Sequence, residues 1–121
     1  MKVGILGAGK MGTDIFQYLM NEPDNMESVL ICRSPQRAEQ ESGKLLRKIE
    51  KKVRRGILSS EEAGQLQARF QITADNRLLE DCDLVIETVL EDLTVKQTVL
   101  KEAEGVVGET CFLVTNTSAL P

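Results

Sequence analysis

A glycine-rich segment near the amino terminus has the spacing of a phosphate-binding turn. Residues 7–12 read GAGKMG, which matches the pattern G-x-G-x-x-G, and they follow the short apolar run Lys2–Leu6. In such a turn the first glycine permits a tight bend and the second lets the backbone approach a pyrophosphate. The third allows a helix to pack closely on a strand, and the helix amino end offers free N–H groups to the phosphates. The predicted contacts of a dinucleotide are Gly7, Ala8, Gly9, Lys10, Met11 and Gly12.

The residues that would bind the adenine ribose lie about twenty positions further on. An acidic residue is typical there in NAD-binding domains, because it accepts hydrogen bonds from the ribose hydroxyls. This sequence instead has Cys32, followed by Arg33 and Ser34. A guanidinium and a hydroxyl suit a 2′-phosphate, although Arg33 could equally stack over the adenine. These side chains favour NADP over NAD, and the predicted cofactor is NAD or NADP.

Histidine is absent from all 121 residues, which excludes Ser–His and Cys–His nucleophile pairs and histidine metal sites. Proton transfer by this chain must therefore use carboxylates, Lys, Tyr, Cys or an outside group. No metal site is expected. The three cysteines are Cys32, Cys82 and Cys111, an odd number of widely spaced thiols that suits a reduced, cytoplasmic protein.

The charge distribution narrows the range of partners. The net charge is −4, with a basic front half and an acidic second half, which argues against general nucleic-acid binding. No apolar run approaches 18 residues, so no membrane span is expected. The segment MKVGILGAGK lacks the features of a secretory signal.

Alternating strand and helix patterns must position these groups. Short apolar runs predict strands over Lys2–Leu6, Ser28–Cys32, Phe70–Thr73, Asp83–Val89 and Cys111–Thr115. Helical spacing of apolar residues predicts helices over Met11–Met20 and Thr94–Ala103. This alternation predicts an α/β fold, a Rossmann-type doubly wound parallel sheet that is covered on both faces.

A basic insertion, residues 36–68, interrupts the alternation after the second strand. Apolar residues at helical spacing are Leu45, Leu46, Ile49 and Val53. Gly56 is a candidate for the left-handed residue that ends a helix. Ser59 and Glu62 have the spacing of a capping box that starts the next one. We therefore expect an inserted helical hairpin.

Together these segments resemble the NAD-binding domain of 3-hydroxyacyl-CoA dehydrogenases. The resemblance rests on GAGKMG, the basic hairpin 36–68, DLVIETVLEDLTVK at 83–96 and TNTSALP at 115–121. It implies that residues 1–121 are one dinucleotide-binding domain. The activity implied is oxidation of an L-3-hydroxyacyl-CoA to the 3-oxo thioester by hydride transfer to NAD.

The resemblance also implies roles for individual residues. Glu91 and Lys96 would lie beside the nicotinamide, with a surface ion pair as the less favoured alternative for these two. Thr88 would lie near the nicotinamide ribose, and Asn116 would contact the cofactor. Ser118 would hydrogen-bond near the reacting hydroxyl. In the basic hairpin, the resemblance makes Arg54 a candidate contact for a phosphate of coenzyme A, while a solvated helix face is an equally favoured interpretation of the basic cluster.

The sequence departs from the family at two places. Cys32 stands where the family has an acidic residue, and the stretch Arg33–Ala38 looks more like NADP-dependent relatives such as pyrroline-5-carboxylate reductases. The family's catalytic histidine, its partner glutamate and an asparagine lie beyond the NTS segment, partly within a helical C-terminal domain that also supplies acyl-CoA and dimer contacts. We therefore expect that domain to be absent here and the chain to be inactive alone, while a homodimer stays an expectation.

Two alternatives to the dehydrogenase interpretation follow from the same residues. A Rossmann domain can serve as a stand-alone dinucleotide-binding sensor or regulatory module, since fold does not fix function. The chain could also be a relative of NADP-dependent imine or pyrroline-5-carboxylate reductases.

Overall fold

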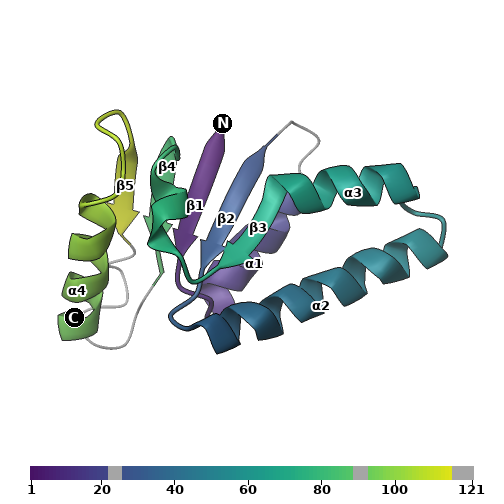
Figure 1. Cartoon of the computed structure of the whole chain (residues 1–121), viewed down its shortest axis with the longest axis horizontal. Helices are drawn as coiled ribbons and strands as arrows, with labels where there is room; N and C mark the ends of the chain where they lie inside the picture. Colours follow the sequence, from purple (N-terminus) through teal and green to yellow (C-terminus); the bar gives the residue numbers. More distant parts are fainter. Residues whose placement is uncertain (22–25, 89–92, 116–121) are drawn as a thin grey trace.

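Five parallel strands form a single sheet in the order β3-β2-β1-β4-β5 (Figure 1). The computed structural model describes residues 1–21, 26–88 and 93–115, and of residues 93–96 and 115 the backbone only. The strands are β1 (Lys2–Leu6), β2 (Glu27–Ile31), β3 (Phe70–Thr73), β4 (Leu84–Glu87) and β5 (Phe112–Thr115). Their carboxyl ends meet at one edge, where Leu6 pairs with Ile31 on one side and Glu87 on the other. All five predicted strands are confirmed; β4 is shorter than expected, because Thr88 already lies beyond it.

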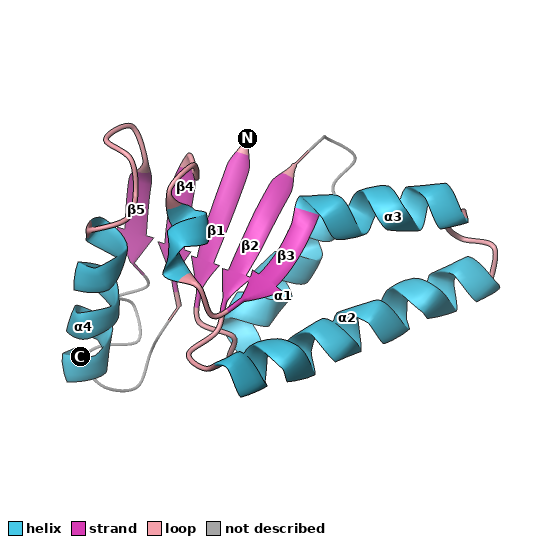
Figure 2. Ribbon diagram, viewed as in Figure 1, coloured by secondary structure: helices cyan, strands magenta, loops and turns pink. Residues whose placement is uncertain are grey.

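Helices cover both faces of the sheet (Figure 2). They are α1 (Lys10–Met20), α2 (Pro35–Arg54), α3 (Ser60–Arg69) and α4 (Leu93–Glu104), with a short 3-10 helix η1 (Asn76–Leu79). One core cluster joins Ile5 and Leu30 of the sheet to α1, α2 and α3. A second joins Val29 and Val85 to η1 and α4. The doubly wound Rossmann arrangement is therefore confirmed, whereas the sequence did not predict η1.

The inserted hairpin consists of α2 and α3. Ser34 caps α2 by accepting a hydrogen bond from the Arg37 backbone N–H at 3.1 Å. Gly56 has a φ of +74° after α2, and Ser59 begins α3 with the expected capping box. One detail differs: Leu46 is 42% exposed, because it points away from the face of α2 that packs on the sheet. None of the helices in the described part of the chain is long and apolar enough to cross a membrane.

Helices cover both faces of the sheet, but two apolar side chains of the outer strand β5 are exposed. Phe112 and Val114 are 75% and 50% exposed. Their register partners Leu84 and Ile86 belong to the cluster on the α1 side of the sheet. No described helix packs over this end of that face, so an apolar strip remains open there.

Candidate functional site

Two of the three glycines in the loop between β1 and α1 are required by backbone conformation or packing within the protein. Gly7 has a φ of +106°, a conformation that other residues rarely adopt. A Cβ on Gly12 would collide with the Gly7 carbonyl oxygen and lie 2.9 Å from the Thr88 hydroxyl. A Cβ on Gly9, by contrast, would meet no heavy atom within 4 Å. The protein leaves open space beside Gly9, which is where a ligand can approach the backbone.

Two threonines turn the carbonyl groups of this loop toward the protein. The buried Thr88 hydroxyl lies 2.8 Å from the Leu6 carbonyl oxygen and 3.2 Å from that of Gly7. The Thr13 hydroxyl donates to the Gly9 carbonyl oxygen at 2.9 Å. The Gly7 N–H donates to the Ile31 carbonyl oxygen at 3.0 Å. Because the loop carbonyl oxygens are occupied, the backbone N–H groups after Gly7 are the polar atoms that the loop presents outward.

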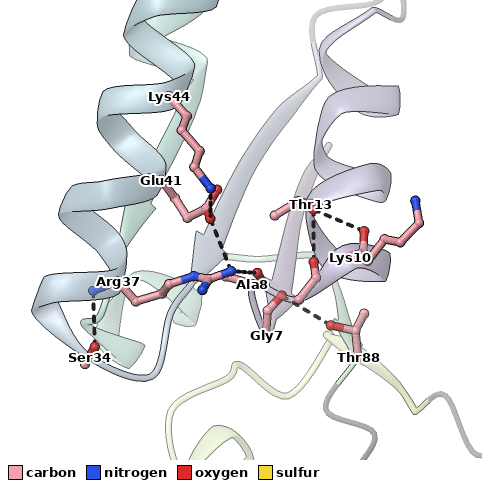
Figure 3. A network of polar contacts seen from close by, with 10 residues as sticks. Gly7, Ala8, Lys10, Thr13, Ser34, Arg37, Glu41, Lys44 and Thr88 are labelled. Atoms are coloured by element: carbon pink, nitrogen blue, oxygen red, sulfur yellow. Dashed lines mark hydrogen bonds and ion pairs between the residues drawn. The ribbon is translucent and has the colours of Figure 1, made fainter.

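A third side chain holds the remaining carbonyl group, that of Ala8. The Arg37 guanidinium extends from the first turn of α2 and donates to the Ala8 carbonyl oxygen at 2.8 Å (Figure 3). Arg37 also lies 3.3 Å from Glu41, whose carboxylate pairs with Lys44 at 3.4 Å. Glu41 is only 8% exposed, so these two cations compensate a buried negative charge.

The amino end of α1 lacks a side-chain cap. Gly9 is its N-cap residue and makes no capping hydrogen bond, whereas Ser34 and Ser59 cap α2 and α3. The first N–H groups of a helix have no partner within the helix, and the helix dipole adds positive potential there. The first turn of α1 contains no acidic residue. This helix end is therefore suited to an anion.

A cleft of about 250 Å³ opens beside this loop at the carboxyl edge of the sheet. Its lining includes Gly7, Cys32 and Arg33 on the sheet side. Glu102 of α4 and Asn76 of η1 form another part of its wall and approach each other at 3.5 Å. Such a cleft at the carboxyl ends of the strands is where open α/β sheets bind ligands. Its position suits the adenosine half of a dinucleotide.

The chemistry of this cleft differs from that of a typical NAD site. Burial, aided by the charge of Glu41, raises the pKa of the Cys32 thiol, so Cys32 is a neutral group at physiological pH. Arg33 is exposed at the cleft, and none of the ion pairs between described residues involves it. Among the described residues that line the cleft, the carboxylate is that of Glu102, on α4 rather than at the end of β2.

The structure brings the predicted residues of the loop and of the β2 end together. Gly7, Cys32 and Arg33 line one cleft, with the rest of the glycine loop beside it. Ser34 lies next to them, but its oxygen caps α2. Thr88 lies beneath the loop, bonded to its carbonyl groups.

Other predicted residues are not brought to this cleft or are not described. Arg54 is the exposed last residue of α2, at the far end of the hairpin from the loop (Figure 1). Lys96 lies in the first half of α4, and its side chain is not described. Glu91, Asn116 and Ser118 lie outside the described residues.

The sequence did not predict the side-chain contacts of Thr13, Arg37 and Glu41. A signal for Glu41 was present, because it falls three residues after Ala38 and four before Leu45, on the apolar face of α2. A charged residue at such a position is expected to be paired. Nothing local indicated that Arg37 reaches Ala8, since these residues are 29 positions apart.

The parallel sheet, the open glycine loop and the adjoining cleft define a dinucleotide-binding Rossmann domain. The family described as "3-hydroxyacyl-CoA dehydrogenase, NAD binding domain" matches residues 2–121, and the chain belongs to this family. This membership favours the dehydrogenase interpretation over the sensor and imine reductase alternatives.

Individual relatives agree with this assignment. A fatty acid oxidation complex subunit alpha from Idiomarina loihiensis is 33% identical over 118 residues, which are 97% of this chain and 16% of the relative. A peroxisomal fatty acid beta-oxidation multifunctional protein from Oryza sativa subsp. japonica is 30% identical over 119 residues, 98% of this chain and 16% of the relative. The crystal structure of (S)-3-hydroxybutyryl-CoA dehydrogenase PaaH1 from Ralstonia eutropha superposes with a TM-score of 0.74 at 26% identity, covering 97% of this chain and 41% of that one. The chain thus spans about a sixth of the length of the first two and less than half of the third.

Proposed function

We propose that this chain binds NAD and supplies the cofactor site for hydride transfer between NAD and a 3-hydroxyacyl-CoA. The observation that carries the proposal is the glycine loop, whose Gly7, Ala8 and Gly9 carbonyl groups are held by Thr88, Arg37 and Thr13 while its N–H side stays open. The loop and the uncapped amino end of α1 would hold the pyrophosphate. The neighbouring cleft would take the adenosine.

The reaction also needs groups at the nicotinamide end. When bound, the nicotinamide supplies the hydride acceptor. We assign its positioning to Thr88, Glu91, Lys96 and Asn116, and a hydrogen bond to the substrate hydroxyl to Ser118. Removal of the hydroxyl proton requires a base. The base that the family resemblance implies is a histidine, and histidine is absent from the 121 residues. We therefore place the catalytic base, together with the acyl pocket, outside these residues.

A binding assay and an activity assay test this proposal together. Calorimetric titration with NADH should show binding, and addition of acetoacetyl-CoA with NADH should give no decrease in absorbance. A chain that binds no dinucleotide would contradict the cofactor site. Turnover at the rate of a working dehydrogenase would contradict the external base.

NADP is a second candidate for the cofactor, and Arg33 is the observation that favours it. Arg33 faces the cleft without an ion-pair partner among the described residues, and no carboxylate ends β2. Two observations oppose it: Glu102 places a negative charge in the same cleft, and Arg37 is already bonded to Ala8 and Glu41. Titrating NADH and NADPH against the wild type and Arg33→Ala decides the choice. NADPH binding that is tighter in the wild type and lost in the variant would establish NADP.

We propose that the coenzyme A part of the substrate binds along α2. Lys44, Lys48 and Lys52 recur every four residues beside a cavity of about 120 Å³ between α1 and α2, and Arg54 ends the same helix. Such a row of cations suits the phosphates of coenzyme A. Calorimetric binding of acetoacetyl-CoA should weaken several-fold in Arg54→Ala and with added salt. Equal affinity in Arg54→Ala and in the wild type would remove Arg54 from the site.

We also propose a cytoplasmic location and a homodimer. Free thiols at Cys32, Cys82 and Cys111 suit a reducing compartment. Fractionation of cells that express the chain tests the location, for which a peroxisomal signal is the contrary outcome. Sedimentation of the chain over a range of concentrations tests the dimer.

A further inference from the structure

Arg37 connects the hairpin to the glycine loop. Its guanidinium Nη2 donates to the Ala8 carbonyl oxygen at 2.8 Å, in a partly buried position. Ala8 has a glycine on each side, and glycines restrict the backbone least. A hydrogen bond from a charged donor is among the stronger polar contacts of a protein. This bond is therefore well placed to fix a loop that its own sequence leaves loose.

Glu41 determines where the Arg37 guanidinium lies. Its carboxylate is one helical turn after Arg37, 3.3 Å from the guanidinium, and 8% of the residue is exposed (Figure 3). Lys44 supplies a second cation at 3.4 Å. Packing and this second ion pair immobilise the carboxylate, so that it serves as a fixed anchor for Arg37.

The contact has a directional consequence for the peptide between Ala8 and Gly9. No cis peptide bond occurs in the described chain, and in a planar trans peptide the C=O and N–H groups point in opposite directions. Since the Ala8 carbonyl group points toward α2, the Gly9 N–H group points away from it. A Cβ on Gly9 would lie in open space, so this side of the loop is accessible.

We propose that Arg37, oriented by Glu41, is a positioning residue for the dinucleotide. It fixes the Ala8–Gly9 peptide so that the Gly9 N–H group faces the pyrophosphate. This inference rests on the proposed dinucleotide binding. It differs from direct recognition, in which the half-exposed guanidinium would contact a phosphate itself.

The experiment compares two ligands and three variants of the 121-residue chain. ADP-ribose contains the pyrophosphate and adenosine lacks it, so only ADP-ribose reports on the loop. We expect Arg37→Ala to weaken ADP-ribose binding about tenfold and Glu41→Gln about threefold. Arg47→Ala, which removes the same charge from the exposed side of α2, should bind like the wild type. Adenosine affinity should stay within twofold of the wild type in all three.

A structural readout accompanies the affinities. In amide NMR spectra of the free protein, the Gly9 resonance should move in Arg37→Ala and Glu41→Gln and stay in place in Arg47→Ala. Circular dichroism establishes that each variant is folded. If Arg37→Ala does not fold, Arg37→Lys takes its place, because lysine keeps the charge but lacks the fixed geometry of the guanidinium.

Different failures have different meanings. Wild-type ADP-ribose affinity and an unmoved Gly9 resonance in Glu41→Gln would overturn the positioning role, leaving Arg37 to act through its charge alone. Equal losses of adenosine and ADP-ribose affinity would also overturn it, because the whole site would have loosened. A wild type that binds neither NADH nor ADP-ribose overturns the proposed function, and this inference with it.

Discussion

Gly9 and Gly12 lie in the same loop, yet replacing each by alanine should affect a different property. The structure predicts a loss of stability at Gly12 and a loss of cofactor binding at Gly9. At Gly12 the new methyl group would collide with the Gly7 carbonyl oxygen and press on the Thr88 hydroxyl, 2.9 Å away. At Gly9 it would meet no heavy atom within 4 Å, and the backbone there (φ −75°, ψ −171°) is one that alanine adopts without strain. Stability and cofactor binding should therefore separate between the two variants.

The magnitudes follow from these contacts. Overpacking at Gly12 costs about 1–3 kcal/mol, and disturbing the Thr88–Gly7 hydrogen bond adds about 1 kcal/mol. We expect Gly12→Ala to lower the free energy of unfolding by about 2–4 kcal/mol, a large part of the stability of such a domain. Gly9→Ala should change it by less than about 1 kcal/mol. Its methyl group should nevertheless weaken NADH binding at least about tenfold, because it holds the pyrophosphate away from the N–H groups.

Urea unfolding and calorimetric titration with NADH measure the two quantities. Gly64→Ala is the matched control, since Gly64 is exposed in α3 and its Cβ would also meet nothing within 4 Å. This control should gain about 0.5–1 kcal/mol of stability and bind NADH normally. Wild-type NADH affinity in Gly9→Ala would refute the assignment of the open space to the cofactor. A wild-type urea midpoint in Gly12→Ala would refute the packing argument.

Three further predictions concern stability and association. Burial raises the pKa of the Cys82 thiol to about 11 from 9.0, so its contribution to stability is present below pH 9 and is lost as the pH rises toward 11. The urea midpoint should therefore fall less steeply between pH 9 and 11 in Cys82→Ala than in the wild type. Equal slopes would exclude this thiol as a cause of the pH dependence. Ser59→Ala removes the cap of α3 and should lower the free energy of unfolding by about 1 kcal/mol, whereas Ser60→Ala, one position inside the helix, should have little effect in the same urea assay. The open apolar strip of Phe112 and Val114 should promote concentration-dependent self-association, which Phe112→Ser should reduce in gel filtration; a monomer at every concentration of the wild type would contradict this.

The features that the sequence predicted correctly are those that local chemistry determines. The apolar runs fold as strands because the sheet interior accepts β-branched and aliphatic residues on both faces. Gly56 and Ser59 mark helix ends because a left-handed residue and a capping hydroxyl act within a few positions of the chain. The same reasoning succeeded at Gly7 and Gly12, whose roles are set by the turn itself and by its packing.

The features that the sequence did not predict depend on contacts between distant segments. Helical periodicity predicted that Leu45 and Leu46 both lie on the apolar face of α2. Adjacent residues of a helix cannot both point to the sheet, and Leu46 is the exposed one. The pattern of the stretch Arg33–Ala38 indicates a basic cluster but does not predict a contact between the Arg37 side chain and the glycine loop. Its bond to Ala8 depends on how α2 leaves the end of β2, and that direction is set by packing of the whole hairpin.

The glycine loop shows why the G-x-G-x-x-G pattern identifies a site only in context. The glycines permit the turn, but they do not decide which way its peptide groups point. Here the Arg37 and Thr88 side chains hold the Ala8 and Gly7 carbonyl groups, whereas the Gly9 carbonyl group accepts from both the backbone N–H and the hydroxyl of Thr13. These side chains contact the protein backbone rather than a ligand. Each occupies a carbonyl oxygen that would otherwise repel an anion. A loop with the same glycines and without Arg37 and Thr88 would keep the bend but would hold the Gly7 and Ala8 carbonyl groups less firmly, so these donors are as much a part of the binding motif as the glycines are.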